Sequence, residues 1–216
     1  MSYVVSCLSG KGGVTKTSIA RAVAVKFLSE DWLVGVIDID LAQASFRKWN
    51  IRRDAAGHLP AIPVISGSLA DVARLKEEEQ FHMLVVDGAA YGSLDSQRVA
   101  EMSDLIIVSC RFSLDDMESA VSTINALVLK GVPKERFCLV FSGVPEQRTS
   151  ANYERARAYL EQTPYFIAEG FIEQMNSITD AQNEGLAMNE IRYPTLRAKI
   201  NQVLDSIVAR LEQLTS

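Results

Sequence analysis

Short runs of apolar and β-branched residues recur over the first two thirds of the chain, and they have the length and composition of buried strands. Six such runs lie at residues 3–8, 33–38, 61–65, 83–87, 105–109 and 137–142. Segments with apolar residues at three- and four-residue spacing separate some of them, at residues 17–28 and 117–129. The pattern therefore predicts strands that alternate with helices.

Most of the predicted strands are apolar on both faces, which is typical of a parallel sheet covered by helices on each side. We therefore expect an α/β fold, with a doubly wound, mostly parallel sheet, in a single domain that spans residues 1–216. The last segment, residues 196–214, has one apolar face, and its positive and negative side chains nearly cancel. It is expected to pack on the domain and not to lie on a membrane.

Composition narrows the function classes. The 216 residues are 48% hydrophobic and 23% charged, with a formal net charge of -5, which excludes an evenly basic nucleic-acid-binding surface but allows a local basic patch. The first residues lack a basic leader, and no window has the roughly 20 apolar residues that span a bilayer. Three widely spaced cysteines fit buried thiols. A cytoplasmic protein without membrane contact is expected.

The strongest chemical signal follows the first strand, where a glycine-rich loop runs directly into a helix. In such a loop the backbone N–H groups point at phosphate oxygens, Lys16 reaches the β- and γ-phosphates, and the Thr17 hydroxyl ligates Mg²⁺. The residues predicted to bind nucleotide are Gly10, Lys11, Gly12, Gly13, Val14, Thr15, Lys16, Thr17 and Ser18. The implied ligands are ATP or ADP with Mg²⁺.

One residue departs from the phosphate-loop pattern G-x-x-x-x-G-K-[ST]. Thr15 stands where the pattern has a glycine, immediately before the lysine. If the backbone there has positive φ, a threonine costs on the order of 1 kcal/mol or more. We therefore expect Thr15 to affect nucleotide affinity or hydrolysis.

Acidic residues follow two of the predicted strands. Asp38 and Asp40 follow the second strand, and Asp87 ends the fourth. A single aspartate after a strand is more often a turn or helix cap, but ligands of an open parallel sheet bind beyond the carboxyl ends of its strands. Three aspartates at the same edge as a phosphate loop instead favour a site that holds Mg²⁺ or orients an attacking water.

With a second lysine, Lys11, early in the phosphate loop, the chain resembles the ParA/MinD family of deviant Walker A ATPases over almost its whole length. The resemblance implies that Lys11 reaches the partner's phosphates in a nucleotide-sandwich homodimer. It also implies that Lys16 contacts the phosphates and that Asp40 positions the attacking water, so all three residues are expected to be catalytic. It also implies that Thr17, Asp38 and Asp87 surround the metal, with Asp87 as the Walker B acid. Ser142 stands where longer relatives often have an adenine-reading asparagine.

Within this family the chain most resembles the short ParF-type plasmid partition proteins. The resemblance implies a slow ATPase in plasmid or chromosome partition, whose ATP-bound dimer binds non-specific DNA until a ParB-like centromere-binding adaptor stimulates hydrolysis. Higher oligomers are left open. The implied location is the nucleoid in the cytoplasm of a prokaryote.

Two groups of basic residues are candidates for DNA contact. One lies on a predicted helix after Asp40, and the other precedes and begins the last helix: Arg47, Lys48, Arg52 and Arg53, and then Arg192, Arg197 and Lys199. For the first group, a solvated helix face with Trp49 packed inward is an equal alternative.

Two other functions stay open at this stage. One is a ParA-like ATPase that positions a protein cargo or a conjugation complex, which the nucleotide site cannot distinguish from DNA partition. The other is a P-loop kinase or synthetase for a small molecule, although no substrate pocket for it is evident in the sequence.

Overall fold

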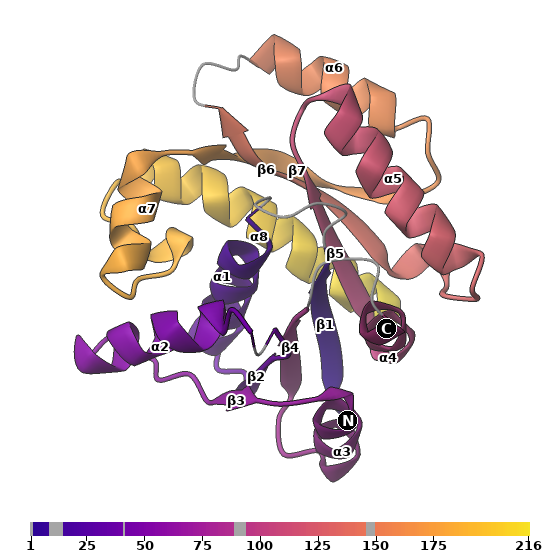
Figure 1. Ribbon diagram of the computed structural model, residues 1–216. Helices are drawn as coiled ribbons and strands as arrows, with labels where there is room; N and C mark the ends of the chain where they lie inside the picture. The colour runs from indigo at the N-terminus through magenta and orange to yellow at the C-terminus, as the bar shows by residue number, and fades with distance from the viewer. Residues whose placement is uncertain (1, 9–14, 41, 89–93, 146–149) are drawn as a thin grey trace.

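A seven-stranded sheet forms the centre of the computed structural model, which describes residues 2–8, 15–40, 42–88, 94–145 and 150–216 (Figure 1). The strands are β1 (Tyr3–Leu8), β2 (Val34–Asp38), β3 (Val64–Ser66), β4 (Met83–Asp87), β5 (Leu105–Cys110), β6 (Phe137–Pro145) and β7 (Phe166–Gln174). Their order is β3-β2-β4-β1-β5-β6-β7, and every neighbouring pair is parallel. The predicted α/β fold with a parallel sheet is confirmed.

Helices cover both faces of the sheet (Figure 1). Buried residues of one face belong to a cluster with α1 (Lys16–Ser29), α2 (Ser45–Ala55), α7 (Asn176–Asn183), the short 3₁₀ helix η2 (Met188–Glu190) and α8 (Pro194–Thr215). The other face packs against α3 (Leu69–Glu78), α4 (Leu94–Met102), α5 (Leu114–Val128) and α6 (Ser150–Leu160). A second 3₁₀ helix, η1 (Lys134–Arg136), precedes β6.

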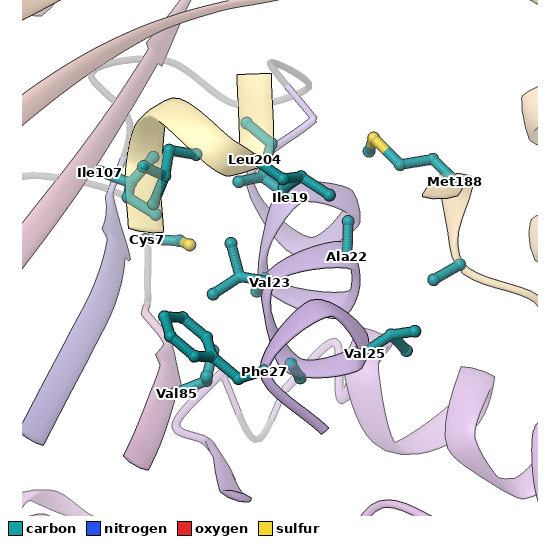
Figure 2. Close-up of a cluster of buried hydrophobic side chains, with 14 of the residues drawn as sticks. Cys7, Ile19, Ala22, Val23, Val25, Phe27, Val85, Ile107, Met188 and Leu204 are labelled. Carbon is teal, nitrogen blue, oxygen red and sulfur yellow. The ribbon is translucent and has the colours of Figure 1, made fainter. Parts of the chain in front are cut away.

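The helix after the glycine loop, α1, lies in the larger of these cores. Figure 2 shows side chains of β1, β4 and β5 meeting those of α1, η2 and α8, among them Val23, Met188 and Leu204. The last helix, α8, buries its apolar stripe in the same cluster, which confirms that it packs on the domain. Within the part of the chain that the structure describes, no helix is both long and apolar enough to cross a membrane.

Two strands differ from the sequence prediction. The third strand was expected at residues 61–65, but it begins only at Val64, because Pro63 has no N–H to donate to a neighbouring strand. The edge strand β7 was not predicted at all. Glu169 and Glu173 interrupt its apolar pattern, and Gly170 lies at φ 84 where the pairing with β6 shifts register.

The sheet brings the predicted acidic residues to one edge. Because β4 lies between β2 and β1, Asp87 pairs in register with Asp38 on one side and with Cys7 on the other. The strand β1 ends one residue later and leads toward α1. The carboxyl ends of β1, β2 and β4 therefore meet where α1 begins.

Candidate nucleotide site

The first turn of α1 supplies the anion-binding end of the site. Lys16 is the first helical residue, and the first turn contains no acidic residue to offset the positive end of the helix dipole. The predicted loop residues Gly10, Lys11, Gly12, Gly13 and Val14 lie outside the described residues. Thr17 and Ser18 follow Lys16 in the same turn, so the described half of the predicted motif begins the helix as expected.

Thr15 has the positive φ at which a threonine is strained. It lies at φ 58 and ψ 15 as the N-cap residue of α1. Its hydroxyl forms a hydrogen bond with the buried hydroxyl of Ser142 on β6. Its methyl group lies so close to Gly143, itself at φ 67, that a Cβ added there would be 3.3 Å from Thr15 Cγ2. The side chain is thus turned toward β6, and this contact offsets part of the backbone strain.

Lys16 and Thr17 both contact the end of β4. The Lys16 ammonium donates to the carbonyl oxygen of Gly88 and lies 3.7 Å from Oδ1 of Asp87. Burial raises the pKa of Asp87 to about 6, although Lys16 and a hydrogen bond from Thr17 act in the opposite direction. The structure therefore brings three predicted site residues together: Lys16, Thr17 and Asp87.

Asp38 and Asp87 form a buried pair of carboxylates. Each is 1% exposed, and Asp38 also contributes to the raised pKa of Asp87. Within the described residues, Oδ1 of each carboxylate is buried and accepts no hydrogen bond. Unsatisfied carboxylate oxygens beside a threonine hydroxyl are the hard ligands that Mg²⁺ prefers. The arrangement of Thr17, Asp38 and Asp87 therefore fits a magnesium ion, either directly or through water.

Asp38 and Asp40 also fix the start of α2. The N-cap residue of α2, Ala44, has no side chain that could cap the helix, and it lies at φ 46. Asp38 substitutes for the missing cap, because its Oδ2 accepts from the N–H of Arg47, 3.2 Å away. Asp40 Oδ1 accepts from the N–H of Gln43, which orients the half-buried carboxylate of Asp40 in the turn before the helix.

Sequence reasoning missed Arg21, which lies on α1 and is 7% exposed. Its guanidinium contacts the first residue of α2 and interacts electrostatically with Asp87 and Asp38. The sequence feature that could have identified Arg21 is a single charged residue within the apolar segment Ile19–Val23 of a helix.

The basic segment on α2 is only partly exposed. Trp49 is fully buried, as the alternative of a solvated helix face with an inward tryptophan predicted, and Arg53 is fully buried as well. Arg53 forms a bidentate ion pair with Glu190, at 2.6 and 2.8 Å. Three cations of the segment remain on the surface: Arg47, Lys48 and Arg52. The second predicted group is exposed, and Lys199 in it lies 3.6 Å from Glu173.

Comparison with protein-family models gives one match, over residues 1–64, to the ParA model, which is described as NUBPL iron-transfer P-loop NTPase. The matched segment contains the phosphate loop, α1, Asp38 and Asp40. A comparison with curated proteins found no match.

Solved structures resemble nearly the whole chain. MinD from Pyrococcus horikoshii OT3, complexed with Mg-ADP, is 15% identical with a TM-score of 0.75, and the match covers 100% of this chain and 98% of the MinD chain. A protein assigned to plasmid partition from Borrelia burgdorferi B31, bound to AMPPNP, is 15% identical with a TM-score of 0.73 (97% and 100% covered). Apo McdA from Cyanothece is 17% identical with a TM-score of 0.74 (98% and 100% covered).

These comparisons confirm the resemblance that the sequence motifs indicated. The family model matches the segment that carries the nucleotide motif, and the fold extends the likeness to the remaining helices and strands. The chain therefore has the fold of the ParA/MinD ATPases, and its first 64 residues match the ParA family model.

Proposed function

We propose that this chain hydrolyses ATP to ADP and phosphate as a slow, partner-stimulated ATPase. The observation that carries the proposal is the convergence of Lys16, Thr17, Asp38 and Asp87 at the carboxyl edge of the sheet, with Asp40 held in the adjacent turn. Relatives in fold bind AMPPNP and Mg-ADP, which supports ATP or ADP as the ligand.

Each described residue has a role in the proposed reaction. Lys16 and the N–H groups of the first turn of α1 would hold the β- and γ-phosphates. Thr17 and Asp87, with Asp38 beside them, would hold Mg²⁺, which neutralises negative charge on the phosphates when bound. Asp40 would orient the attacking water through its carboxylate, in line with the bond that breaks. Thr15 would anchor the end of the loop, because its side chain is hydrogen-bonded to Ser142 on β6.

The description of the matched family model mentions iron transfer, and the cysteines of this chain argue against that activity here. Iron–sulfur clusters are held by accessible thiolates. Cys7, Cys110 and Cys138 are all buried, at 1%, 1% and 0% exposure, and burial raises the pKa of each thiol, to about 12 for Cys110 and Cys138. Neutral, buried thiols are unreactive, so they do not form a metal-transfer site.

The biological role that we propose is DNA partition. In this proposal, ATP drives a sandwich homodimer in which Lys11 contacts the partner's phosphates, the dimer binds non-specific DNA, and a ParB-like adaptor triggers hydrolysis and release. The protein would then act in the prokaryotic cytoplasm, on the nucleoid. A fold relative assigned to plasmid partition and exposed cations on α2 support this role.

Light scattering with ADP, ATP and a non-hydrolysable analogue tests the proposal, with and without duplex DNA. The natural chain should dimerise with ATP and bind DNA of any sequence, and Lys11→Ala should bind ATP but stay monomeric. A chain that binds ATP but stays monomeric and does not bind DNA would contradict the partition role. Dimers that ignore DNA but capture a protein would instead favour the positioning of a protein cargo, and a phosphorylated small-molecule product would favour a kinase.

A further inference from the structure

Arg21 lies where three helices meet beside the proposed nucleotide site. It is on α1, five residues after Lys16, which corresponds to about 7.5 Å along the helix axis. The helices α2 and α7 pack against α1 in the same cluster. A rigid helix therefore connects Arg21 to the phosphate lysine.

The guanidinium of Arg21 holds the first turn of α2. Its Nη2 donates to the carbonyl oxygen of Ser45, the first residue of α2, over 2.6 Å. Its Cζ lies 5.1 Å from the centre of the Trp49 ring and 6.0 Å from that of Phe46, which places the cation against two buried rings of α2. One arginine thus contacts the backbone and the aromatic core of the same helix.

A third contact joins Arg21 to α7. Its Nη1 donates to Oε1 of Gln182 over 3.3 Å, and the same oxygen accepts from the Ser18 hydroxyl over 3.1 Å. Burial lowers the pKa of Arg21 to about 10, so the group is charged at neutral pH. A charged, planar group with several fixed partners has little freedom to move.

The turn that precedes α2 contains Asp40. The N–H of Ala44 donates to the carbonyl oxygen of Asp40 over 2.7 Å, and the N–H of Gln43 donates to its carboxylate. Ser45, which Arg21 holds, follows immediately. The position of the Asp40 carboxylate relative to Lys16 therefore depends on how α2 is fixed against α1.

We propose that Arg21 is a positioning residue for the hydrolysis described above: it fixes the first turn of α2 against α1 and thereby keeps Asp40 in place over the phosphates. This inference rests on the proposed function for its kinetic part. The contacts of the Arg21 guanidinium described above are all with protein groups, so its removal should affect turnover and not the binding of nucleotide.

The test compares Arg21→Met and Arg21→Lys with Arg210→Met, which is a matched control. Arg210 also donates to a backbone carbonyl, that of Glu135, and lies 5.0 Å from the centre of an aromatic ring, that of Phe166. It lies on α8, and its hydrogen bonds and ring contact involve none of the predicted site residues that the structure describes. All variants are made in a Trp32→Phe background, which leaves Trp49 as the sole tryptophan of the chain.

Three measurements are made on each variant: the Kd of a fluorescent ATP analogue with Mg²⁺, the rate of phosphate release, and the quenching of Trp49 fluorescence by acrylamide. Arg21→Met should slow phosphate release by about tenfold or more, because a small misplacement of a catalytic group is costly, and should change Kd by less than about twofold. It should also make Trp49 more accessible to the quencher. Arg21→Lys keeps the charge but not the planar contacts and should behave like Arg21→Met, whereas Arg210→Met should match the background.

Other results would overturn the inference. Unchanged turnover and quenching in Arg21→Met would show that α2 is fixed without Arg21. Equal losses in Arg210→Met would show a general loss of stability, and full activity in Arg21→Lys would show that charge alone suffices. If the background chain releases no phosphate, the proposed function fails, and the quenching of Trp49 then decides by itself whether Arg21 fixes α2.

Discussion

Thr15 combines an unfavourable backbone with a favourable contact, and substitutions can separate the two. Thr15→Ala keeps a side chain at φ 58 and leaves the buried Ser142 hydroxyl without this partner. Thr15→Gly also loses the hydrogen bond but removes the strain of the left-handed conformation. We expect Thr15→Ala to lower the free energy of unfolding by about 1–2 kcal/mol, and Thr15→Gly to lower it by less.

Urea denaturation of the nucleotide-free protein measures this difference. Ser142→Ala is the matched variant, because it removes the same hydrogen bond from the β6 side. If Thr15→Gly is the less stable of the two Thr15 variants, the left-handed backbone is not a source of strain.

Asp87 predicts a pH dependence of stability. The pKa of Asp87 in the folded chain is about 6, above the ordinary aspartate value of about 3.9, so the folded state favours the protonated form. Between these values the folded protein binds more protons than the unfolded one, and stability falls as pH rises. Asp87→Asn removes the buried charge. It should stabilise the nucleotide-free protein at pH 8 by at most about 3 kcal/mol, since two pKa units correspond to that free energy.

This gain should shrink as pH falls through about 6 and vanish near pH 4, as measured by urea denaturation in EDTA. Glu77→Gln, at an exposed position, serves as the control and should show no such trend. A gain that is the same at every pH, or a loss at pH 8, would be incompatible with a raised pKa of Asp87.

At the scale of elements, an ion pair between a fully buried arginine and a partly buried glutamate joins α2 to η2. Arg53 is 0% exposed and donates to Glu190 and to the carbonyl oxygens of Gly185, Leu59 and Pro60. Arg53→Met removes the arginine donor from these carbonyl groups and leaves the Glu190 carboxylate with the N–H of Ala187 as its donor. Since breaking one half of a buried pair is costly, thermal and urea denaturation should show a loss of about 3–5 kcal/mol.

The neighbouring Arg52 provides the control on the same helix, because it is exposed. Arg52→Met should change stability by less than about 0.5 kcal/mol. Glu190→Gln and the double variant complete a double-mutant cycle, in which the two losses should not add. Additive losses would mean that the pair makes no specific contribution.

The elements also show what sequence patterns can predict. The central strands and α1, α5 and α8 followed from apolar periodicity, because their burial depends mainly on their own residues. The edge strand β7 did not, since its glutamates break the apolar pattern and its pairing with β6 shifts register. Arg53 was counted as a surface cation because its partner, Glu190, lies 137 residues away.

The candidate site likewise contains residues that the sequence predicts and contacts that it does not predict. Lys16, Thr17, Asp38 and Asp87 were predicted from a local motif and from the rule that strands of a parallel sheet end at one edge, and the structure brings them together. The capping of α2 by Asp38 and the contacts of Arg21 could not be predicted. Both depend on the angle at which α2 packs on α1, which no single segment specifies.

At the scale of the whole molecule, charge limits where the proposed DNA binding can take place. The net charge is -5, so binding to phosphates requires a local surface such as the exposed Arg47, Lys48 and Arg52 of α2. The double change Arg47→Glu and Lys48→Glu should weaken ATP-dependent binding to duplex DNA by about tenfold or more. It should also reduce the slope of log K against log salt by about 2 for each protomer whose α2 contacts the DNA, because each such protomer loses two phosphate contacts.

The control reverses the same amount of charge at the amino end of β6, with Lys130→Glu and Lys134→Glu, two exposed residues that precede this strand. A binding surface on α2 predicts that this variant loses only the small affinity expected from net charge, with the natural salt slope, and that both variants bind ATP equally well. Fluorescence anisotropy of labelled duplex, titrated at several salt concentrations, measures both quantities. Equal losses of DNA affinity in the two variants would mean that binding depends only on the net charge of the molecule. An unchanged salt slope in the α2 variant would place the DNA-binding surface elsewhere.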